Sequence, residues 1–156
     1  MDIDFTWLEN NFFNTKLNET QRNLIASMIE VQTYTAKQVI VEQGSMGHAL
    51  YVIQQGVASI DCSNNGESIR VATAHIGDLI GEMSFLTAAE VSATVTACED
   101  CVIYRLSRAT FSEMMKQDQE LAYAVFAHLL NHTADVIRHM NQEKAAVQHY
   151  MSGSRF

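Results

Sequence analysis

The chain has 156 residues, 47% hydrophobic and 18% charged, and this balance predicts one folded domain with its own core. Ten Lys and Arg residues against 18 Asp and Glu residues give a net charge of −8. That charge argues against direct nucleic-acid binding, because phosphate contacts need clustered cations. No apolar run approaches the roughly 20 residues of a spanning helix, and the amino terminus, with Asp2 and Asp4, is unlike a secretory signal. We therefore expect a cytoplasmic protein that contacts neither nucleic acid nor membrane.

Residues 1–35 form the first predicted segment, which is helical. Asn18 is a favourable N-cap, and Gln21 occupies the capping-box position three residues later. The apolar residues that follow fall on one helical face: Leu24, Ile25, Met28 and Ile29. Four aromatic residues near the start are expected to pack across a neighbouring element: Phe5, Trp7, Phe12 and Phe13.

Residues 36–107 read as short strands separated by turns. The expected strands cover residues 37–41, 49–53, 57–62, 68–74, 92–97 and 101–106. Asn64-Asn65-Gly66 is a strong hairpin signal between two of them. Short strands with turn signals every 8 to 12 residues or so predict a sandwich or barrel.

Residues 108–150 are again helical, and residues 151–156 are expected to be a tail. Ser107 or Thr110 is the candidate cap of a short helix, and a long helix follows from about residue 119 to about residue 150. Apolar residues in this long helix recur in steps of four and three, which is coiled-coil spacing. We therefore predict a homodimer through Phe126, Leu129, Thr133, Val136 and Met140. The alternative is a single helix packed on its own domain.

The most informative segment is Gly77-Asp78-Leu79-Ile80-Gly81-Glu82-Met83-Ser84-Phe85-Leu86, followed by Glu90-Val91-Ser92-Ala93-Thr94-Val95. It resembles the phosphate-binding cassette of the cyclic nucleotide-binding domain family, and the match extends in order over roughly residues 20–140. The resemblance implies a mainly β fold. The centre of that fold is an eight-stranded antiparallel β-roll, also called a jelly roll or double-stranded β-helix. It is flanked by N-terminal helices and by a long C-terminal helix. Residues 1–150 would form that single domain.

The cassette has residues suited to a phosphate. Gly81 permits an unusual backbone angle, and the free N–H groups of a short helix after it point at one spot. The Glu82 carboxylate can accept a hydrogen bond from a ribose hydroxyl. The Ser92 hydroxyl and the backbone N–H of Ala93 can donate hydrogen bonds to a phosphate. The candidate ligand-binding residues are Gly81, Glu82, Met83, Ser84, Ser92 and Ala93. The alternative is a tight barrel turn with a solvated acid.

One departure from the family pattern affects this site. The family places Pro-Arg where this chain has Glu90-Val91, so the phosphate-binding arginine is replaced by Val91. Valine offers neither charge nor donors, and the missing bond is worth about 1.5–3 kcal/mol, or roughly 10- to 150-fold in affinity. Arg70 is either a substitute from the preceding strand or, as we favour, part of a surface ion pair. The expected ligand is a weakly bound cyclic nucleotide (cAMP or cGMP) or another small anion.

Cysteines and histidines form two further patterns. Cys98 and Cys101 have CxxC spacing, but without a second pair they are expected to be ordinary turn residues. His128, His132 and His139 lie on the long helix. We favour ordinary surface histidines there; the alternatives are a metal site, which would need a third ligand, and a pH-sensitive dimer seam.

No catalytic motif is present, so we expect no enzyme and no resident metal. The chain stops where bacterial regulators of this family continue into a helix-turn-helix. We expect a cytoplasmic, stand-alone bacterial regulatory module that senses a nucleotide-like ligand and signals through its long helix. The alternatives are a ligand-free dimeric protein-interaction or scaffold domain with a degenerate pocket, and the sensor part of a transcription regulator or other larger regulator.

Overall fold

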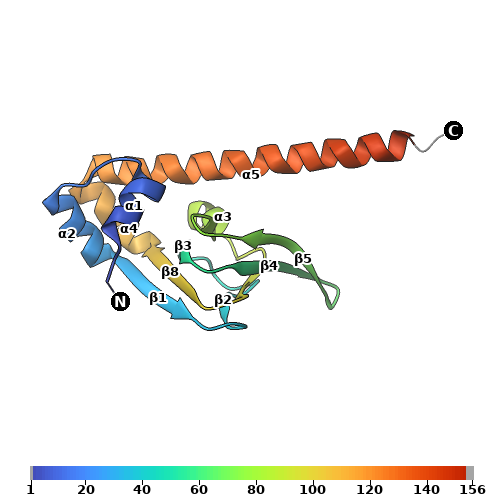
Figure 1. Ribbon diagram of the computed structural model, residues 1–156, viewed down its shortest axis with the longest axis horizontal. Coiled ribbons are helices and arrows are strands. Elements are labelled where there is room, and N and C mark those ends of the chain that lie inside the picture. Colours follow the sequence, from blue (N-terminus) through green and yellow to red (C-terminus); the bar gives the residue numbers. More distant parts are fainter. Residues whose placement is uncertain (1, 154–156) are drawn as a thin grey trace.

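Two four-stranded antiparallel sheets form the centre of the computed structural model, which describes residues 2–153. One sheet has the order β1-β8-β3-β6 and the other β2-β7-β4-β5 (Figure 1). The strands are β1 (Ile29–Tyr34), β2 (Val39–Val41), β3 (Ala49–Gln55), β4 (Ala58–Asn64), β5 (Glu67–Ala74), β6 (Leu79–Ile80), β7 (Thr94–Ala97) and β8 (Cys101–Ser107). The eight-stranded antiparallel roll is confirmed.

Helices flank the roll on one side (Figure 1). They are α1 (Phe5–Leu8), the π-helix η1 (Glu9–Phe13), α2 (Glu19–Met28), α3 (Glu82–Thr87), α4 (Arg108–Gln117) and α5 (Gln119–Gly153). Among the helices of residues 2–153, only α3 comes between two strands of the roll in the chain, since it follows β6 and precedes β7. Of the helices formed by residues 2–153, none combines the length and apolar character needed to cross a bilayer.

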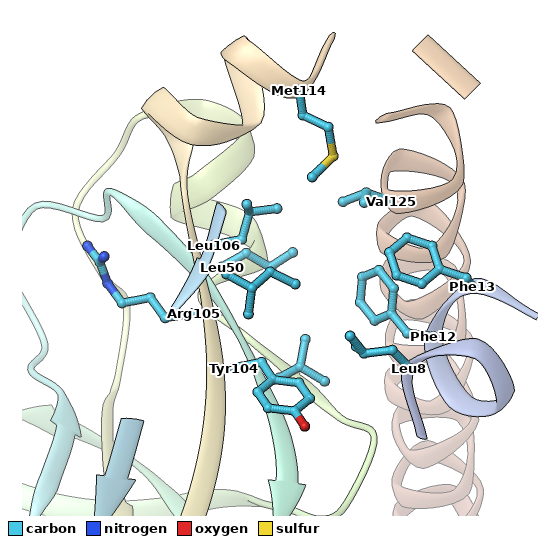
Figure 2. Close-up of a pocket in the computed structure, with 11 residues that line it drawn as sticks. Leu8, Phe12, Phe13, Leu50, Tyr104, Arg105, Leu106, Met114 and Val125 are labelled. Atoms are coloured by element: carbon cyan, nitrogen blue, oxygen red, sulfur yellow. The ribbon is translucent and has the colours of Figure 1, made fainter. Parts of the chain in front are cut away.

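The main hydrophobic core lies between the helices and the β1-β8-β3 sheet. Figure 2 shows Phe12, Phe13 and Val125 on the helical side facing Leu50 and Leu106 on the strands. The gap between them is only about 20 Å³ and is lined almost entirely by apolar groups. A space of this size and lining accommodates no organic ligand. A second core cluster fills the interior of the roll.

The N-terminal helices follow the local signals in the sequence. Asn18 Oδ1 accepts from the Gln21 N–H at 2.9 Å and Gln21 Oε1 accepts from the Asn18 N–H at 3.1 Å, so the capping box is confirmed. Phe12 and Phe13 are buried, and Trp7 packs edge-to-face on Tyr104 with ring centroids 5.8 Å apart. The expected packing of the aromatic segment on a neighbouring element is therefore confirmed.

Glu9 is a buried carboxylate within this helical segment. Its oxygens accept from Arg22, from Lys16 at 2.9 Å and from the Leu17 N–H at 3.1 Å. The Arg22 guanidinium, followed by Lys16 and the Leu17 N–H, lowers the pKa of Glu9 to about 2. The chain itself thus supplies every partner that this charge needs.

Residues 29–34 correct the prediction of a helical segment reaching residue 35. They form β1, which pairs with β8 from Ile29 opposite Leu106 to Tyr34 opposite Cys101. The helix ends because Ile29 is extended, with φ −95° and ψ 128°. Ile29, Val31 and Thr33 are β-branched residues at alternate positions, a pattern that favours a strand.

The C-terminal helices begin as expected and then extend past the roll. Ser107 caps α4, since its Oγ accepts from the Thr110 N–H at 3.0 Å. The first part of α5 packs on the domain through four buried residues: Leu121, Ala122, Val125 and Leu129. From residue 135 to residue 152 every residue of α5 is exposed, and Figure 1 shows this part projecting beyond the strands.

Candidate ligand-binding site

The turn into α3 has the backbone geometry that the sequence predicted. Gly81 has φ +79° and ψ 14°, a left-handed conformation that glycine adopts readily. A Cβ at this position would lie 3.1 Å from the Ala49 carbonyl oxygen, which also favours glycine. The Gly81 carbonyl accepts from the Phe85 N–H at 2.9 Å and from Ser84 Oγ at 3.1 Å, so the short helix starts immediately after it.

The predicted ligand residues differ in exposure. Glu82 and Ala93 are half-buried, whereas Met83 and Ser92 are exposed. Ser84 is 3% exposed and bonds to the backbone of its own helix, so it supports the fold of the cassette and does not face solvent.

Two loops beside α3 hold the cassette in shape. A Cβ on Gly47 would lie 2.1 Å from Ser84 Cβ, so the loop before β3 packs directly on α3. The same loop pairs with the segment after α3, because Ser45 accepts from the Val91 N–H and Gly44 donates to the Val91 carbonyl, both at 2.8 Å. The three segments therefore form one connected unit.

Val91, at the family's arginine position, points into the protein. Its side chain is 8% exposed and belongs to the cluster inside the roll, together with Ile80 and Val95. The residue thus contributes apolar packing where the family pattern has a charge.

Arg70 forms a surface ion pair, as the sequence favoured. Its Nε lies 3.2 Å from Asp61 Oδ1, and the side chain is 60% exposed. The Ser59 hydroxyl, and after it Arg70, lower the pKa of Asp61, although burial opposes them. This pair joins β4 to the opposite residue of β5.

Arg108 makes hydrogen bonds to the cassette that the sequence did not predict. Its Nε donates to the Phe85 carbonyl at 3.0 Å, and its Nη2 donates to the Gly47 carbonyl at 2.7 Å and to the Ser84 carbonyl. Its backbone N–H donates to the His48 carbonyl at 2.8 Å. Arg108 therefore joins the carboxyl end of α3 and the loop before β3 to the first residue of α4.

The cysteines are free thiols in three different surroundings. Cys62 Sγ lies 3.7 Å from the Ser92 carbonyl, and Cys98 is exposed in the turn between β7 and β8. Cys101 corrects the prediction of a turn residue: it begins β8, it is buried, and burial raises the pKa of its thiol. Within residues 2–153, no three His, Cys, Asp or Glu side chains are grouped to hold a metal ion.

Two of the three histidines correct the prediction of surface residues. His128 is half-buried and stacks on Phe12 with ring centroids 4.2 Å apart; burial, and then the neighbouring His132, lower its pKa. His132 Nε2 accepts from the Leu79 N–H at 3.4 Å and lies 4.0 Å from Asp78 Oδ1. Only His139 is exposed, 3.7 Å from Glu143.

The predicted dimer residues divide between the core and the surface. Leu129 is 1% exposed and belongs to the domain's own core, so a partner helix cannot contact it. Thr133 is half-buried and donates to the Leu129 carbonyl at 2.9 Å. Phe126, Val136 and Met140 are 40%, 39% and 61% exposed. The homodimer stays a prediction, with its contacts limited to this exposed set.

Comparisons with known proteins agree with this architecture. The sequence model of the family described as the cyclic nucleotide-binding domain matches residues 31–118. A cAMP-dependent protein kinase regulatory subunit from Dictyostelium discoideum is 29% identical over 137 residues, which cover 86% of this chain and 41% of the relative. The chain thus spans less than half the length of this curated relative.

Solved structures show the same fold. A cyclic nucleotide-binding domain from Methylobacillus flagellatus KT superposes with a TM-score of 0.80 at 19% identity, over 89% of this chain and 81% of that one. The regulatory domain of Toxoplasma gondii PKA, crystallised with cAMP, gives a TM-score of 0.59 at 28% identity, over 69% and 41% of the two chains.

Proposed function

The chain belongs to the cyclic nucleotide-binding domain family, and we propose that it is a non-enzymatic regulatory module that binds its cyclic nucleotide weakly. One observation carries the proposal: the cassette keeps its glycine turn and short helix, while Val91 is buried in the roll and supplies no cation. The solved relative crystallised with cAMP supports cAMP as the first ligand to test.

Glu82, Ser92 and Ala93 are the proposed ligand contacts. Glu82 begins α3 and is half-buried, and its carboxylate can accept from a ribose hydroxyl. The exposed Ser92 hydroxyl and the Ala93 N–H can donate to a phosphate. Neutral donors replace one charged hydrogen bond, so affinity falls by about 10- to 150-fold relative to a cassette that has the arginine.

The proposed signal leaves the site through α3. Ligand binding at the amino end of α3 changes the position of a helix whose carboxyl end is hydrogen-bonded to Arg108 at the start of α4. The α5 helix follows α4 after Asp118 and carries the exposed surface for a second copy. The size of the response is limited by the difference in ligand affinity between the two positions. We also propose that this module is located in the cytoplasm.

Isothermal titration calorimetry with cAMP and cGMP tests the proposal. We expect binding in the micromolar range or weaker, and its loss in Glu82→Ala. Glu67→Ala is the matched control, since Glu67 is an exposed acid at the start of β5, at the tip of the β4–β5 hairpin. Absence of binding at millimolar nucleotide, or equal binding by the two variants, would contradict the proposal.

A ligand-free dimeric interaction domain is the second candidate. Two observations favour it: Val91 fills the interior of the roll, and α5 exposes Ile137, Met140 and Val147 beyond the domain. Sedimentation equilibrium tests it, with Met140→Glu expected to shift a dimer to monomer. Gln142→Glu adds the same charge to another exposed position of α5 and should leave the dimer intact. A dimer without millimolar nucleotide binding would favour this candidate; a monomeric wild-type chain would exclude it.

A further inference from the structure

A groove of about 650 Å³ lies where α3, α4 and α5 meet. Its apolar lining comes from all three helices: Phe85, Leu86, Phe111, Met115, Ala122, Tyr123 and Phe126. Phe85 and Phe111 pack edge-to-face with centroids 5.6 Å apart, while Leu86, Met115, Tyr123 and Phe126 are each at least 39% exposed. Volume and lining both lie in the range of small-molecule sites.

Among residues 2–153, Arg108 is the one charged residue that lines this groove. The other arginines within residues 2–153 each pair with a carboxylate: Arg22 with Glu9, Arg70 with Asp61, Arg105 with Glu30, and Arg138 with Asp135. Arg108 is half-buried. Within residues 2–153, its guanidinium donates hydrogen bonds only to carbonyl oxygens. These carbonyls satisfy donors but carry no net charge, so the Arg108 cation has no counterion among residues 2–153.

We infer that this groove binds an amphiphilic anion, with an aromatic or aliphatic body against the apolar wall and a carboxylate or sulfonate paired with Arg108. The Nη1 donors are available for this contact, because no residue of the described chain accepts a hydrogen bond from Nη1. The site is separate from the cassette: Arg108 meets the carboxyl end of α3, and Gly81 lies at the amino end. It does not depend on nucleotide binding.

Two matched fluorescent probes test the inference on the full chain. One is 1-anilinonaphthalene-8-sulfonate, and the other is N-phenyl-1-naphthylamine, which has the same aromatic body without the charge. We expect the sulfonate to bind about tenfold or more tightly than the neutral probe, because a hydrogen bond to a charged group contributes about 1.5–3 kcal/mol. Arg108→Gln should remove that preference, and Arg108→Lys should keep most of it.

Two substitutions on α5 locate the binding. Phe126→Asp places a repelling charge on the groove wall and should weaken the sulfonate at least tenfold. Gln142→Asp adds the same charge at an exposed position of α5 outside the groove and should change the affinity less than twofold. Circular dichroism spectra establish that each variant is folded.

Three results would overturn the inference. One is equal affinity of wild-type protein for the two probes, and another is equal weakening by Phe126→Asp and Gln142→Asp. The third is that a second copy already covers the groove. In that case the wild-type protein would be a dimer that does not bind the sulfonate, and Phe126→Asp would dissociate it. Decanoate that competes with the sulfonate, where decanol does not, would extend the inference to fatty acids.

Discussion

The two ends of α3 lie in opposite electrostatic surroundings. At the amino end the left-handed turn of Gly81 leads into Glu82, and Val91 stands where the family pattern has an arginine. At the carboxyl end Arg108 donates to three carbonyl oxygens of α3 and the neighbouring loop. A cation near the carboxyl end of a helix stabilises it, whereas one near the amino end serves an anionic ligand. The carboxyl end of α3 thus has Arg108 as a cation that stabilises the helix, whereas position 91 at the amino end supplies no cation for a phosphate.

The largest expected effect comes from restoring a cation at the amino end. Val91→Arg should lower the free energy of unfolding by about 3 kcal/mol or more, because an unpaired charge enters an apolar cluster. That charge is unpaired only in the ligand-free protein, and the phosphate of bound cAMP would pair with it, so the affinity for cAMP should rise by roughly 10- to 150-fold. Urea unfolding with and without cAMP measures both effects. Val91→Met is the larger apolar control; its added volume should cost about 1–3 kcal/mol, and it should leave the affinity for cAMP unchanged. An arginine variant as stable as wild type would show that position 91 is not buried.

Removing the cation at the carboxyl end should have the next largest effect. Arg108→Gln leaves the Ser84, Phe85 and Gly47 carbonyls short of donors and should cost about 1–3 kcal/mol. Hydrogen exchange should accelerate in α3. Arg138→Gln removes an exposed pair with Asp135 and should change stability by less than about 1 kcal/mol. Equal losses in the two variants would contradict a structural role for Arg108 at α3.

Glu9 is a buried charge that, unlike an arginine at position 91, has its hydrogen-bond partners within the protein. Its folded-state pKa of about 2 lies below the ordinary value of 4.5, so its contribution to stability is complete above pH 4.5 and disappears as the pH falls toward 2. Urea midpoints at pH 5 and pH 3 should therefore differ more in wild type than in Glu9→Gln. The same difference in both proteins would assign the acid sensitivity to other groups.

The smallest effect should come from Arg70. Arg70→Gln breaks an exposed pair with Asp61 and should cost less than about 1 kcal/mol. Its cAMP affinity should stay within twofold of wild type, as calorimetry would measure. A tenfold loss would instead identify Arg70 as the cation that serves the amino end of α3.

Local chemistry made much of this molecule predictable from sequence. The capping box of Asn18 and Gln21, the cap at Ser107 and the left-handed Gly81 each depend on residues within one turn, and each is confirmed. The strand β1 was missed because Ile29 continues the apolar face of the preceding helix, and no Gly or Pro separates helix from strand. There the pairing with β8 outweighs the local pattern.

The surroundings of single side chains were harder to predict. Arg108 was missed because its acceptors lie 23 to 61 residues away in the chain, where spacing gives no signal. The sequence showed that Val91 removes a charge, but only the fold shows that its side chain packs inside the roll. His128 and His132 were placed on the surface because the sequence gives no sign that Phe12 and Leu79 meet α5 there.

The length of α5 converts small rotations into large displacements. From residue 135 to residue 152 the helix has no buried residue, and at 1.5 Å per residue this exposed part extends about 27 Å. A tilt of about 10° where α5 leaves the roll would carry its far end through roughly 5 Å. In the proposed function, a small change at α3 that reaches α5 would thus become a displacement large enough to open or close a contact with a second copy.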